Sequence, residues 1–234
     1  MRKQKNFLFV CVAVFFLIMA CFGTVAAQGT EKLRDRIIDP TLLNPPVEEP
    51  VHEEEKEVYD YSTGKGVTMI GDSIMSGNRD LIYDQLPDAL IDAKGSRDVC
   101  GGFEAARRLQ QEGKLTDVVI VELGTNGPLL KHEPYASGTQ NLLELLGTER
   151  QILWVTVYCS YSQWMKMNNE YIWELSMTRP NIKVIDWYSL AVNHPEWFPD
   201  GVHPNLEGAR HFAKLLRDSL AEMSTTKKSE EPAL

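Results

Sequence analysis

The sequence predicts a three-layer α/β/α fold built on a five-stranded parallel sheet. Short apolar runs alternate five times with longer stretches of helical periodicity, an order typical of a parallel sheet covered by helices on both faces. Polar residues of known chemical use follow several of these runs directly, and the ligand site of such a sheet lies beyond the carboxyl ends of its strands. We therefore expect one globular domain within the 234 residues.

The five apolar runs have the length of buried strands. Runs without polar alternation are typical of strands covered on both faces. They occupy residues 67–70, 89–93, 117–123, 151–158 and 182–186. The stretches between and after them have helical character and occupy residues 74–86, 102–112, 135–146, 162–177 and 205–222.

The first 27 residues have the pattern of an export signal. Arg2, Lys3 and Lys5 precede an apolar run over residues 7–22, and small residues follow up to position 27. Cleavage after residue 27 would release the protein, whereas retention would leave a membrane anchor, because a helix over residues 7–27 is about 31 Å long and spans a bilayer. Lipidation at Cys21 is a third alternative. In each case the rest of the chain lies outside the cytoplasm.

Residues 28–66 are predicted to be a disordered tether. They contain four prolines followed by an acidic stretch, and they show no sustained helix or strand period. The polar residues 224–234 are predicted to be a disordered tail. The domain is therefore expected to span residues 67–223.

The composition argues against several partners. The formal net charge is −9, which disfavours binding to nucleic acid or anionic lipid. No spacing of His or Cys resembles a metal site, and we expect no cofactor and a monomer. Outside the leader the cysteines are Cys100 and Cys159, which either form a disulfide in an oxidising exterior or serve as small buried apolar side chains.

Ser73 is the first candidate for catalysis. The segment GDS at residues 71–73 directly follows the first predicted strand and precedes a predicted helix. Ser73 should therefore lie at a strand-to-helix turn with its hydroxyl exposed and its backbone N–H free of helical partners, which suits a nucleophile. A serine at this position can also be the N-cap of the helix. Asp72 is expected to hydrogen-bond within the turn.

A second segment, DGVH at residues 200–203, supplies a carboxylate three residues before an imidazole. Gly201 permits a turn, and Pro204 keeps His203 out of helical geometry. Taken alone, His203 could satisfy a loop carbonyl and Asp200 could cap a turn. Together with Ser73 they favour a catalytic triad in the chain order Ser, Asp, His.

With two further segments, these residues resemble the SGNH, or GDSL-type, superfamily of serine esterases and acyltransferases. The resemblance covers residues 67 to about 221 and rests on GDSI at 71–74, DAKGSRD at 92–98, VELGTNG at 121–127 and DGVHPN at 200–205. Within the superfamily, the chain looks most like the extracellular catalytic domain of peptidoglycan O-acetyltransferases. The resemblance implies an SGNH-hydrolase-like, flavodoxin-like arrangement of the sheet.

The resemblance also implies a role for each matching residue. Ser73 is similar to the family nucleophile, His203 to the base and Asp200 to its partner. Asn126 is similar to the amide that joins the Ser73 backbone N–H in the oxyanion hole, although Asn126 and the glycine after it could instead form a tight turn. Superfamily members usually place an oxyanion-hole glycine in the second segment, and Gly95 is the candidate, but the residues around it depart from the common pattern.

On this basis the sequence predicts an extracytoplasmic serine enzyme that acts on O-acetyl groups of cell-wall glycan through an acyl-serine intermediate. Transfer to a sugar hydroxyl would make it an O-acetyltransferase, whereas transfer to water would make it a carbohydrate acetylesterase. A non-catalytic glycan-binding module is a third alternative, and the intact triad argues against it. The substrate would be an acetylated glycan or a small acyl ester.

Two further expectations concern partners. The peptidoglycan enzymes usually fuse this domain to a many-helix membrane acyltransferase, so as a transferase this chain would need a separate integral-membrane protein as acetyl donor. Trp197 and Phe198 directly precede the Asp200 turn. We therefore expect them to border the substrate pocket and to face a sugar ring or an acyl group.

Overall fold

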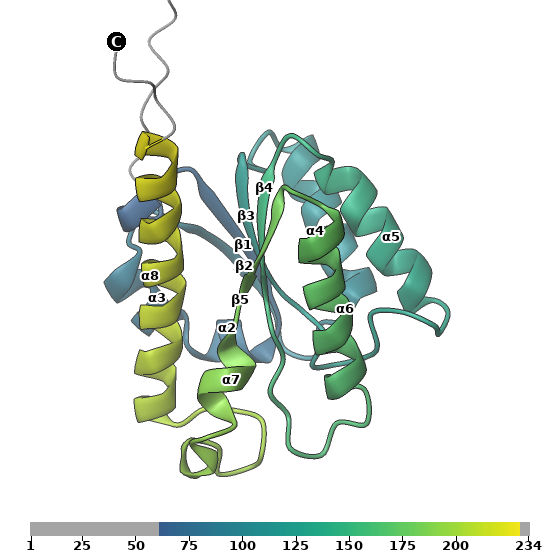
Figure 1. Ribbon diagram of the computed structural model, residues 1–234, viewed down its shortest axis with the longest axis vertical. Helices are drawn as coiled ribbons and strands as arrows, with labels where there is room; N and C mark the ends of the chain where they lie inside the picture. The colour runs from purple at the N-terminus through teal and green to yellow at the C-terminus, as the bar shows by residue number, and fades with distance from the viewer. Residues whose placement is uncertain (1–60, 230–234) are drawn as a thin grey trace, which may run out of the picture. The chain divides into compact units, whose positions relative to one another are not determined.

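The computed structural model describes residues 61–229 of the chain. The predicted leader and residues 28–60 of the predicted tether lie outside this range. Within it, one five-stranded sheet lies between two layers of helices (Figure 1), which confirms the predicted three-layer α/β/α fold.

The five strands are all parallel to their neighbours. They are β1 (Val67–Gly71), β2 (Leu90–Ala93), β3 (Val118–Glu122), β4 (Gln151–Val155) and β5 (Ile182–Ile185). Their order in the sheet is β2-β1-β3-β4-β5, so the direction of winding reverses between β1 and β3. Ligand sites of doubly wound sheets lie outside the carboxyl ends of the strands at such a reversal. Gly71 pairs with Glu122, so β1 and β3 end level with each other at this point.

Helices cover both faces of the sheet (Figure 1). The helices α3 (Arg79–Gln85) and α8 (Leu206–Ser229) lie on one side, and α4 (Val99–Gln111), α5 (Tyr135–Leu146) and α6 (Met165–Thr178) lie on the other. Two short helices, α2 (Ser73–Gly77) and α7 (Trp187–Ala191), follow the carboxyl ends of β1 and β5. Single turns of 3₁₀ helix occur at Tyr61–Thr63 (η2) and Pro195–Trp197 (η3).

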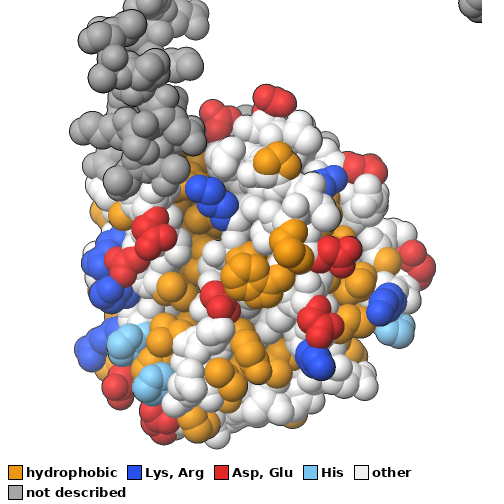
Figure 2. Space-filling model, viewed as in Figure 1, with side chains coloured by type: hydrophobic (Ala, Val, Ile, Leu, Met, Phe, Trp, Pro, Cys, Tyr) orange, Lys and Arg blue, Asp and Glu red, His pale blue; other side chains and the backbone are white. Residues whose placement is uncertain are grey.

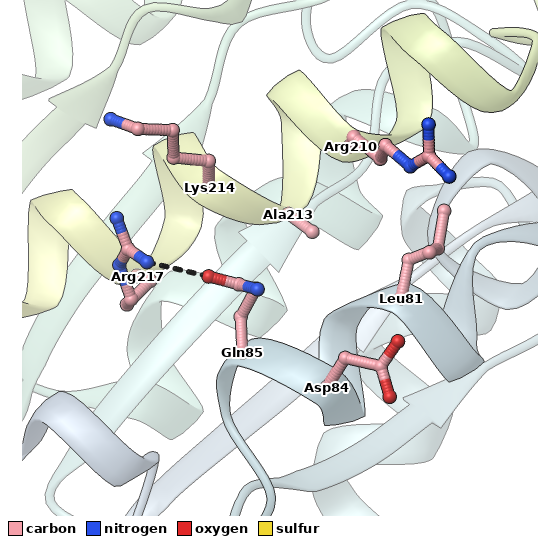
Figure 3. Close-up of a pocket in the computed structure, with 7 residues that line it drawn as sticks. All are labelled: Leu81, Asp84, Gln85, Arg210, Ala213, Lys214 and Arg217. Atoms are coloured by element: carbon pink, nitrogen blue, oxygen red, sulfur yellow. Dashed lines mark hydrogen bonds between the residues drawn. The ribbon is translucent and has the colours of Figure 1, made fainter.

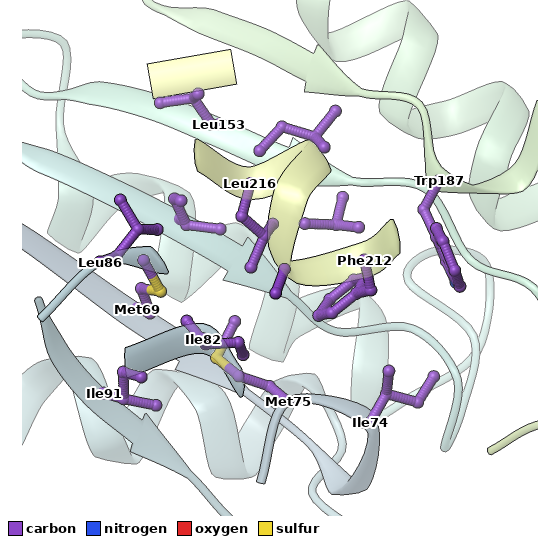
Figure 4. Close-up of a cluster of buried hydrophobic side chains, with 14 of the residues drawn as sticks. Met69, Ile74, Met75, Ile82, Leu86, Ile91, Leu153, Trp187, Phe212 and Leu216 are labelled. Atoms are coloured by element: carbon purple, nitrogen blue, oxygen red, sulfur yellow. The ribbon is translucent and has the colours of Figure 1, made fainter. Parts of the chain in front are cut away.

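Two apolar clusters hold the layers together. Alternate side chains of a strand point to opposite faces, and β1 accordingly sends Met69 into one cluster and Ile70 into the other. The first cluster lies between the sheet and the helices α3 and α8, where Ile82, Phe212 and Leu216 are fully buried (Figure 4). The central strands β1 and β3 are buried along their whole length, which explains why they contain almost no polar side chains.

Two helices differ from the prediction. The stretch 74–86 forms two helices because the chain leaves helical geometry at Asn78, whose side-chain amide donates a hydrogen bond of 2.7 Å to Ile74 O. The helix α7 was not predicted, because five residues are too few for helical periodicity to be recognised. It begins at Asp186, whose carboxylate caps it by accepting a hydrogen bond from Ser189 N.

The predicted domain was too short at both ends. Tyr61 is only 4% exposed and belongs to the first apolar cluster, so residues 61–66 are part of the domain rather than of a tether. At the other end α8 continues to Ser229, so the predicted tail begins inside a helix. The reason is in the sequence, since no Gly or Pro stands between Met223 and Pro232 to end the helix.

Within residues 61–229, no helix is long and apolar enough to cross a membrane. On the face shown in Figure 2, acidic and basic side chains are interspersed with apolar ones, a mixture typical of a solvated protein surface. Cys100 and Cys159 are both free. Of the two alternatives for these cysteines, the structure therefore shows no disulfide.

Candidate active site

The turn after β1 exposes the hydroxyl of Ser73. Ser73 is the first residue of α2, and the N-cap is Asp72, whose Oδ1 accepts a hydrogen bond of 2.9 Å from Ile74 N. The capping role considered for Ser73 thus belongs to its neighbour, and the Ser73 hydroxyl is left for other contacts. As the first helical residue, Ser73 has a backbone N–H without a partner inside the helix.

Gly71 allows this turn to pack closely. A β-carbon at Gly71 would lie 2.6 Å from Met75 Cβ and 3.0 Å from Glu122 Oε2, so a larger residue would push α2 away from the sheet. The glycine therefore sets the distance between the Ser73 turn and the end of β3.

Ser73, His203 and Asp200 converge at the carboxyl edge of the sheet. Ser73 Oγ lies 3.0 Å from His203 Nε2, and His203 Nδ1 lies 2.7 Å from Asp200 Oδ2. Both distances are within hydrogen-bond range. Side chains that are far apart in the sequence thus meet at the hydrogen-bond distances that a triad of nucleophile, base and orienting acid requires.

The turn that carries Asp200 and His203 is held by its own backbone. Asp200 Oδ1 accepts hydrogen bonds from Val202 N at 3.0 Å and His203 N at 2.8 Å, so the carboxylate is fixed to the backbone that carries the imidazole. Gly201 has a φ of +84°, a conformation that other residues adopt only with strain. Beyond the turn, Asn205 Oδ1 accepts from Gly208 N and caps the start of α8.

These hydrogen bonds determine the charge of Asp200. They hold the pKa of Asp200 well below its ordinary value, chiefly through the side-chain contact with His203 and then through the backbone N–H groups of His203 and Val202. Asp200 is therefore ionised across the neutral range. An ionised carboxylate accepts from Nδ1–H, so Nε2 of a neutral His203 is free to act as a base toward Ser73.

Asn126 lies in the loop after β3, next to the Ser73 turn. Its side-chain Nδ2 donates to Asp72 Oδ2 at 3.0 Å and to the carbonyl oxygen of Arg97 at 3.2 Å. The amide is partly exposed. The structure thus places the Asn126 amide against Asp72, the residue before Ser73, and its role as an oxyanion donor stays a prediction.

The loop that carries Asn126 is organised by a residue that the sequence analysis did not identify. Asn168, on α6, is fully buried and forms three hydrogen bonds to this loop. Its Nδ2 donates to Gly124 O at 2.8 Å and Gly127 O at 2.9 Å, and its Oδ1 accepts from Leu129 N at 2.9 Å. The sequence holds one signal that could have identified it, two consecutive asparagines on the buried face of a helix. An amide without hydrogen-bond partners is costly there, so such a pair indicates that the amides bind nearby polar groups.

Gly95 lies in an exposed turn after β2. The contact from this loop to Asn126 comes from Arg97, which presents a carbonyl oxygen. The guanidinium of Arg97 is held by the side chain of Asp92 at 2.7 Å and donates to Gly71 O at 3.2 Å. Arg97 therefore ties the loop to the end of β1.

The expectation that Trp197 and Phe198 border the substrate pocket was wrong. Their exposed fractions are 2% and 5%, and both belong to the first apolar cluster. The Trp197 ring is stacked between His194 and His211, with centroid distances of 4.0 Å and 4.5 Å. An aromatic pair before a turn can anchor the turn as readily as it can line a site, and here it anchors the turn.

The triad lies on an open surface. The side chains of His203 and Asp200 are 49% and 55% exposed. A separate groove of about 390 Å³ lies between α3 and α8 (Figure 3), and no triad residue lines it. In that groove Arg217 donates to Gln85 at 2.6 Å. Within the described range, no group of three or more His, Cys, Asp or Glu side chains is placed to hold a metal ion.

Comparison with known proteins finds relatives in sequence and in fold. No protein-family model matches the chain. The peptidoglycan O-acetyltransferase OatA of Listeria monocytogenes is 30% identical over 152 residues, which are 63% of this chain and 22% of the relative. The chain spans about a quarter of the length of the curated relatives that it matches.

Solved structures show the same fold. The C-terminal catalytic domain of the Streptococcus pneumoniae peptidoglycan O-acetyltransferase OatA superposes with a TM-score of 0.61 at 23% identity and covers 70% of this chain and 96% of that domain. A GDSL-like lipase of Bacteroides thetaiotaomicron superposes with a TM-score of 0.56 at 15% identity and covers 67% and 88%. The described domain therefore has the fold of these solved structures and is similar in sequence to part of the peptidoglycan O-acetyltransferases.

Proposed function

We propose that this protein is an extracytoplasmic O-acetyltransferase that moves acetyl groups onto cell-wall glycan through an acetyl-Ser73 intermediate. The observation that carries the proposal is the pair of contacts that joins Ser73 to His203 and His203 to Asp200. The names of the related proteins support the acetyl group and the glycan as the two sides of the reaction.

The first half-reaction uses the triad. As Ser73 Oγ attacks the acetyl carbonyl carbon, His203 Nε2 accepts its proton, and Asp200 stabilises the resulting imidazolium through Nδ1–H. The Ser73 backbone N–H and the Asn126 amide donate to the oxyanion. Collapse of the tetrahedral intermediate breaks the bond to the donor alcohol, which leaves with the proton from His203.

The second half-reaction runs the same steps in reverse. The hydroxyl group of an acceptor gives its proton to His203 and attacks the acetyl-Ser73 carbonyl. The intermediate then collapses, releases the acetylated acceptor and returns the proton to Ser73 Oγ. A sugar hydroxyl as acceptor completes a transfer, whereas water completes a hydrolysis.

The open site suits a polymeric substrate. A half-exposed base can be reached by a hydroxyl on a long glycan strand, which a closed pocket would exclude. Beside the triad, Tyr161 is 70% exposed, and its ring lies 3.3 Å from the place where a β-carbon of Gly201 would stand. This ring replaces Trp197 and Phe198 as the aromatic surface that we assign to a sugar.

The location and partners belong to the same proposal. The leader pattern of residues 1–27 supports export, with the domain outside the cytoplasm and either anchored or released. A separate integral-membrane acyltransferase would then supply the acetyl donor.

The test offers the purified chain an acetyl ester as donor, together with chitooligosaccharides or muropeptides as acceptors. Mass spectrometry then measures acetylated sugar and free acetate. Acetylated sugar that requires Ser73 is the expected result. Free acetate as the sole product would instead make the protein a carbohydrate acetylesterase, and binding of the glycan without either product would make it a glycan-binding module.

A further inference from the structure

Two carboxyl groups are buried together beneath the Ser73 turn. Asp72 precedes the nucleophile and is fully buried, and Glu122 ends β3 and is 4% exposed. The proposed reaction uses neither of them directly. Buried acids require partners, because an unpaired buried charge is costly.

Glu122 holds the backbone of the turn. Its Oε2 accepts hydrogen bonds from Asp72 N at 3.0 Å and from Met75 N at 3.4 Å. Glu122 therefore fixes the backbone on both sides of Ser73, the residue that supplies both the nucleophile and one oxyanion donor.

The two carboxyl groups are buried beside each other, and two negative charges in one buried site repel, so one of the two groups keeps a proton. Burial raises the pKa of Glu122 well above its ordinary value, and the neighbouring Asp72 raises it further. Burial also raises the pKa of Asp72, but Asp72 receives hydrogen bonds from Ile74 N and Asn126 Nδ2, which favour its ionised form. The proton therefore belongs to Glu122, and the pair carries one negative charge.

We propose that protonated Glu122 and ionised Asp72 form a positioning pair that holds the Asn126 amide and the Ser73 backbone in place to receive the oxyanion. This inference rests on the proposed acyl-transfer function. Both residues act through others, so neither is a catalytic residue in the sense of touching the reacting atoms.

The contacts of Asn126 explain how the pair works. One contact of Nδ2 is to the charged Asp72 carboxylate, and the other is to the neutral carbonyl of Arg97. A hydrogen bond to an ionised acceptor is about twice as strong as one between neutral groups. A developing oxyanion would therefore displace Arg97 O and leave the contact with Asp72 as the anchor of the amide.

The proton on Glu122 matters because of the neighbouring charges. The charged groups beside the pair include His203, whose charge acts on Asp72, and the Arg97 guanidinium, which donates to Gly71 O next to Asp72. A second negative charge in this buried space would repel the oxyanion. With Glu122 protonated, the pair has one negative charge, which lies on Asp72 and holds the Asn126 amide.

The first test compares two replacements of Glu122 in the purified full-length chain. Glu122→Gln is neutral and keeps an acceptor for the backbone N–H of Asp72, so we expect kcat for aryl acetate hydrolysis within about threefold of the wild type. Glu122→Met has a similar volume without that acceptor, so we expect kcat to fall on the order of a hundredfold, as for loss of one oxyanion donor, with KM within about threefold.

The second test asks whether Asp72 acts through Asn126. Asp72→Asn keeps a capping oxygen for Ile74 N but places a donor opposite the Asn126 amide. If Asp72 acts through Asn126, kcat of the double variant Asp72→Asn/Asn126→Ala equals that of Asn126→Ala alone, because coupled residues are not additive. Fully multiplied losses would show a separate structural role and overturn the proposal. This test also decides the question if Glu122→Met does not fold.

A third readout is independent of activity. Glu122 has a raised pKa in the folded state, so its stabilising effect is complete below the unfolded pKa of about 4.3 and is lost as the pH rises from there toward the folded value. Glu122→Gln does not titrate. Its melting temperature should therefore exceed that of the wild type at pH 7 and converge with it near pH 4.

These readouts separate the two proposals. A wild type without activity toward any acetyl ester refutes the acyl-transfer function, while the melting temperatures still test the proton on Glu122. An active wild type whose Glu122→Gln variant loses as much kcat as Glu122→Met overturns the positioning pair, as does a Glu122→Met variant with full kcat. Equal melting temperatures of wild type and Glu122→Gln at pH 7 would also overturn it.

Discussion

Ser160 and Gly201 join the loop after β4 to the turn that carries the acid and the base. Ser160 N donates a hydrogen bond of 2.9 Å to Gly201 O, and a β-carbon on Gly201 would lie 2.4 Å from Ser160 Oγ. The position of His203 over Ser73 therefore depends on a glycine that allows this close approach.

Replacing that glycine tests the dependence. In Gly201→Ala the new residue has a positive φ and its β-carbon has a close contact with Ser160, and both effects should shift the turn. A misplacement of about 1 Å in a catalytic group lowers the rate on the order of a hundredfold. We expect kcat for aryl acetate hydrolysis to fall at least about tenfold. The matched control is Gly113→Ala, because Gly113 also has a positive φ, of +66°, but a β-carbon there meets nothing within 4 Å. A loss of stability without loss of kcat is expected in the control, and the same result in Gly201→Ala would contradict the account.

Asp200→Asn tests the role of the acid. The variant keeps an oxygen for the backbone N–H groups but favours the wrong tautomer of His203, so we expect kcat to fall by about four orders of magnitude. Retention of more than a tenth of wild-type kcat would remove Asp200 from the triad.

The same variant has a pH-dependent effect on stability. The pKa of Asp200 is lowered in the folded state, so ionised Asp200 stabilises the fold above its unfolded pKa of about 3.9, and this contribution is lost as the pH falls through the folded value. The melting temperature of the wild type should exceed that of Asp200→Asn at pH 7, and the difference should shrink below about pH 4. The difference will be small because the pair is half exposed.

The sequence predicted the sheet well because burial dictates its composition. The strand β1 lies between two layers of helices and therefore needs apolar residues on both faces. The run from Val67 to Ile70 has this composition, so it was recognised as a buried strand. The ends of elements were harder to predict. Tyr61 is buried by α8, which lies far away in the sequence, so no local pattern marks it as part of the domain.

For the site, local spacing predicted the pair of Asp200 and His203, and the family resemblance supplied Ser73 and Asn126. The residues that support the site from elsewhere in the fold were missed. Asp200 and His203 lie within one turn, so their spacing alone suggests a pair. Asn168 and Glu122 reach the site from another helix and another strand, and only the fold brings them to it. Trp197 was misassigned because its place in the sequence, just before the Asp200 turn, does not show whether the ring faces the site or the apolar core.

Asn126→Ala tests the oxyanion donor. Loss of one such donor should lower kcat on the order of a hundredfold or more with little change in KM, since the amide acts on the transition state. The control is Asn193→Ala, because the Asn193 amide is exposed and donates only to Ser189 O among the contacts seen. Turnover near the wild-type level would return Asn126 to the role of a turn residue.

Asn168→Ala tests the support of the same loop. The substitution leaves Gly124 O, Gly127 O and Leu129 N without their partner, and each buried unsatisfied group costs about 1–3 kcal/mol. We expect the free energy of unfolding in urea to fall by at least about 2 kcal/mol, together with a loss of kcat. Lys166→Ala, an exposed change on the same helix, should alter neither quantity. An unchanged free energy of unfolding in Asn168→Ala would show that the loop keeps its conformation without the Asn168 side chain.

In the proposed reaction Ser73 carries the acyl group, so trapping an acyl or sulfonyl group on this residue tests the proposal. The chain is treated with a short sulfonyl fluoride or a slow acetyl ester, and the modified peptide is located by mass spectrometry. We expect one modified residue, Ser73, with no labelling in Ser73→Ala or His203→Ala. The control Ser76→Ala, whose hydroxyl contacts only Ser73 O among the described groups, should be fully labelled. We also expect kcat of Ser73→Ala to fall by at least about three orders of magnitude. Labelling at another residue, or an unchanged rate in Ser73→Ala, would contradict the proposal.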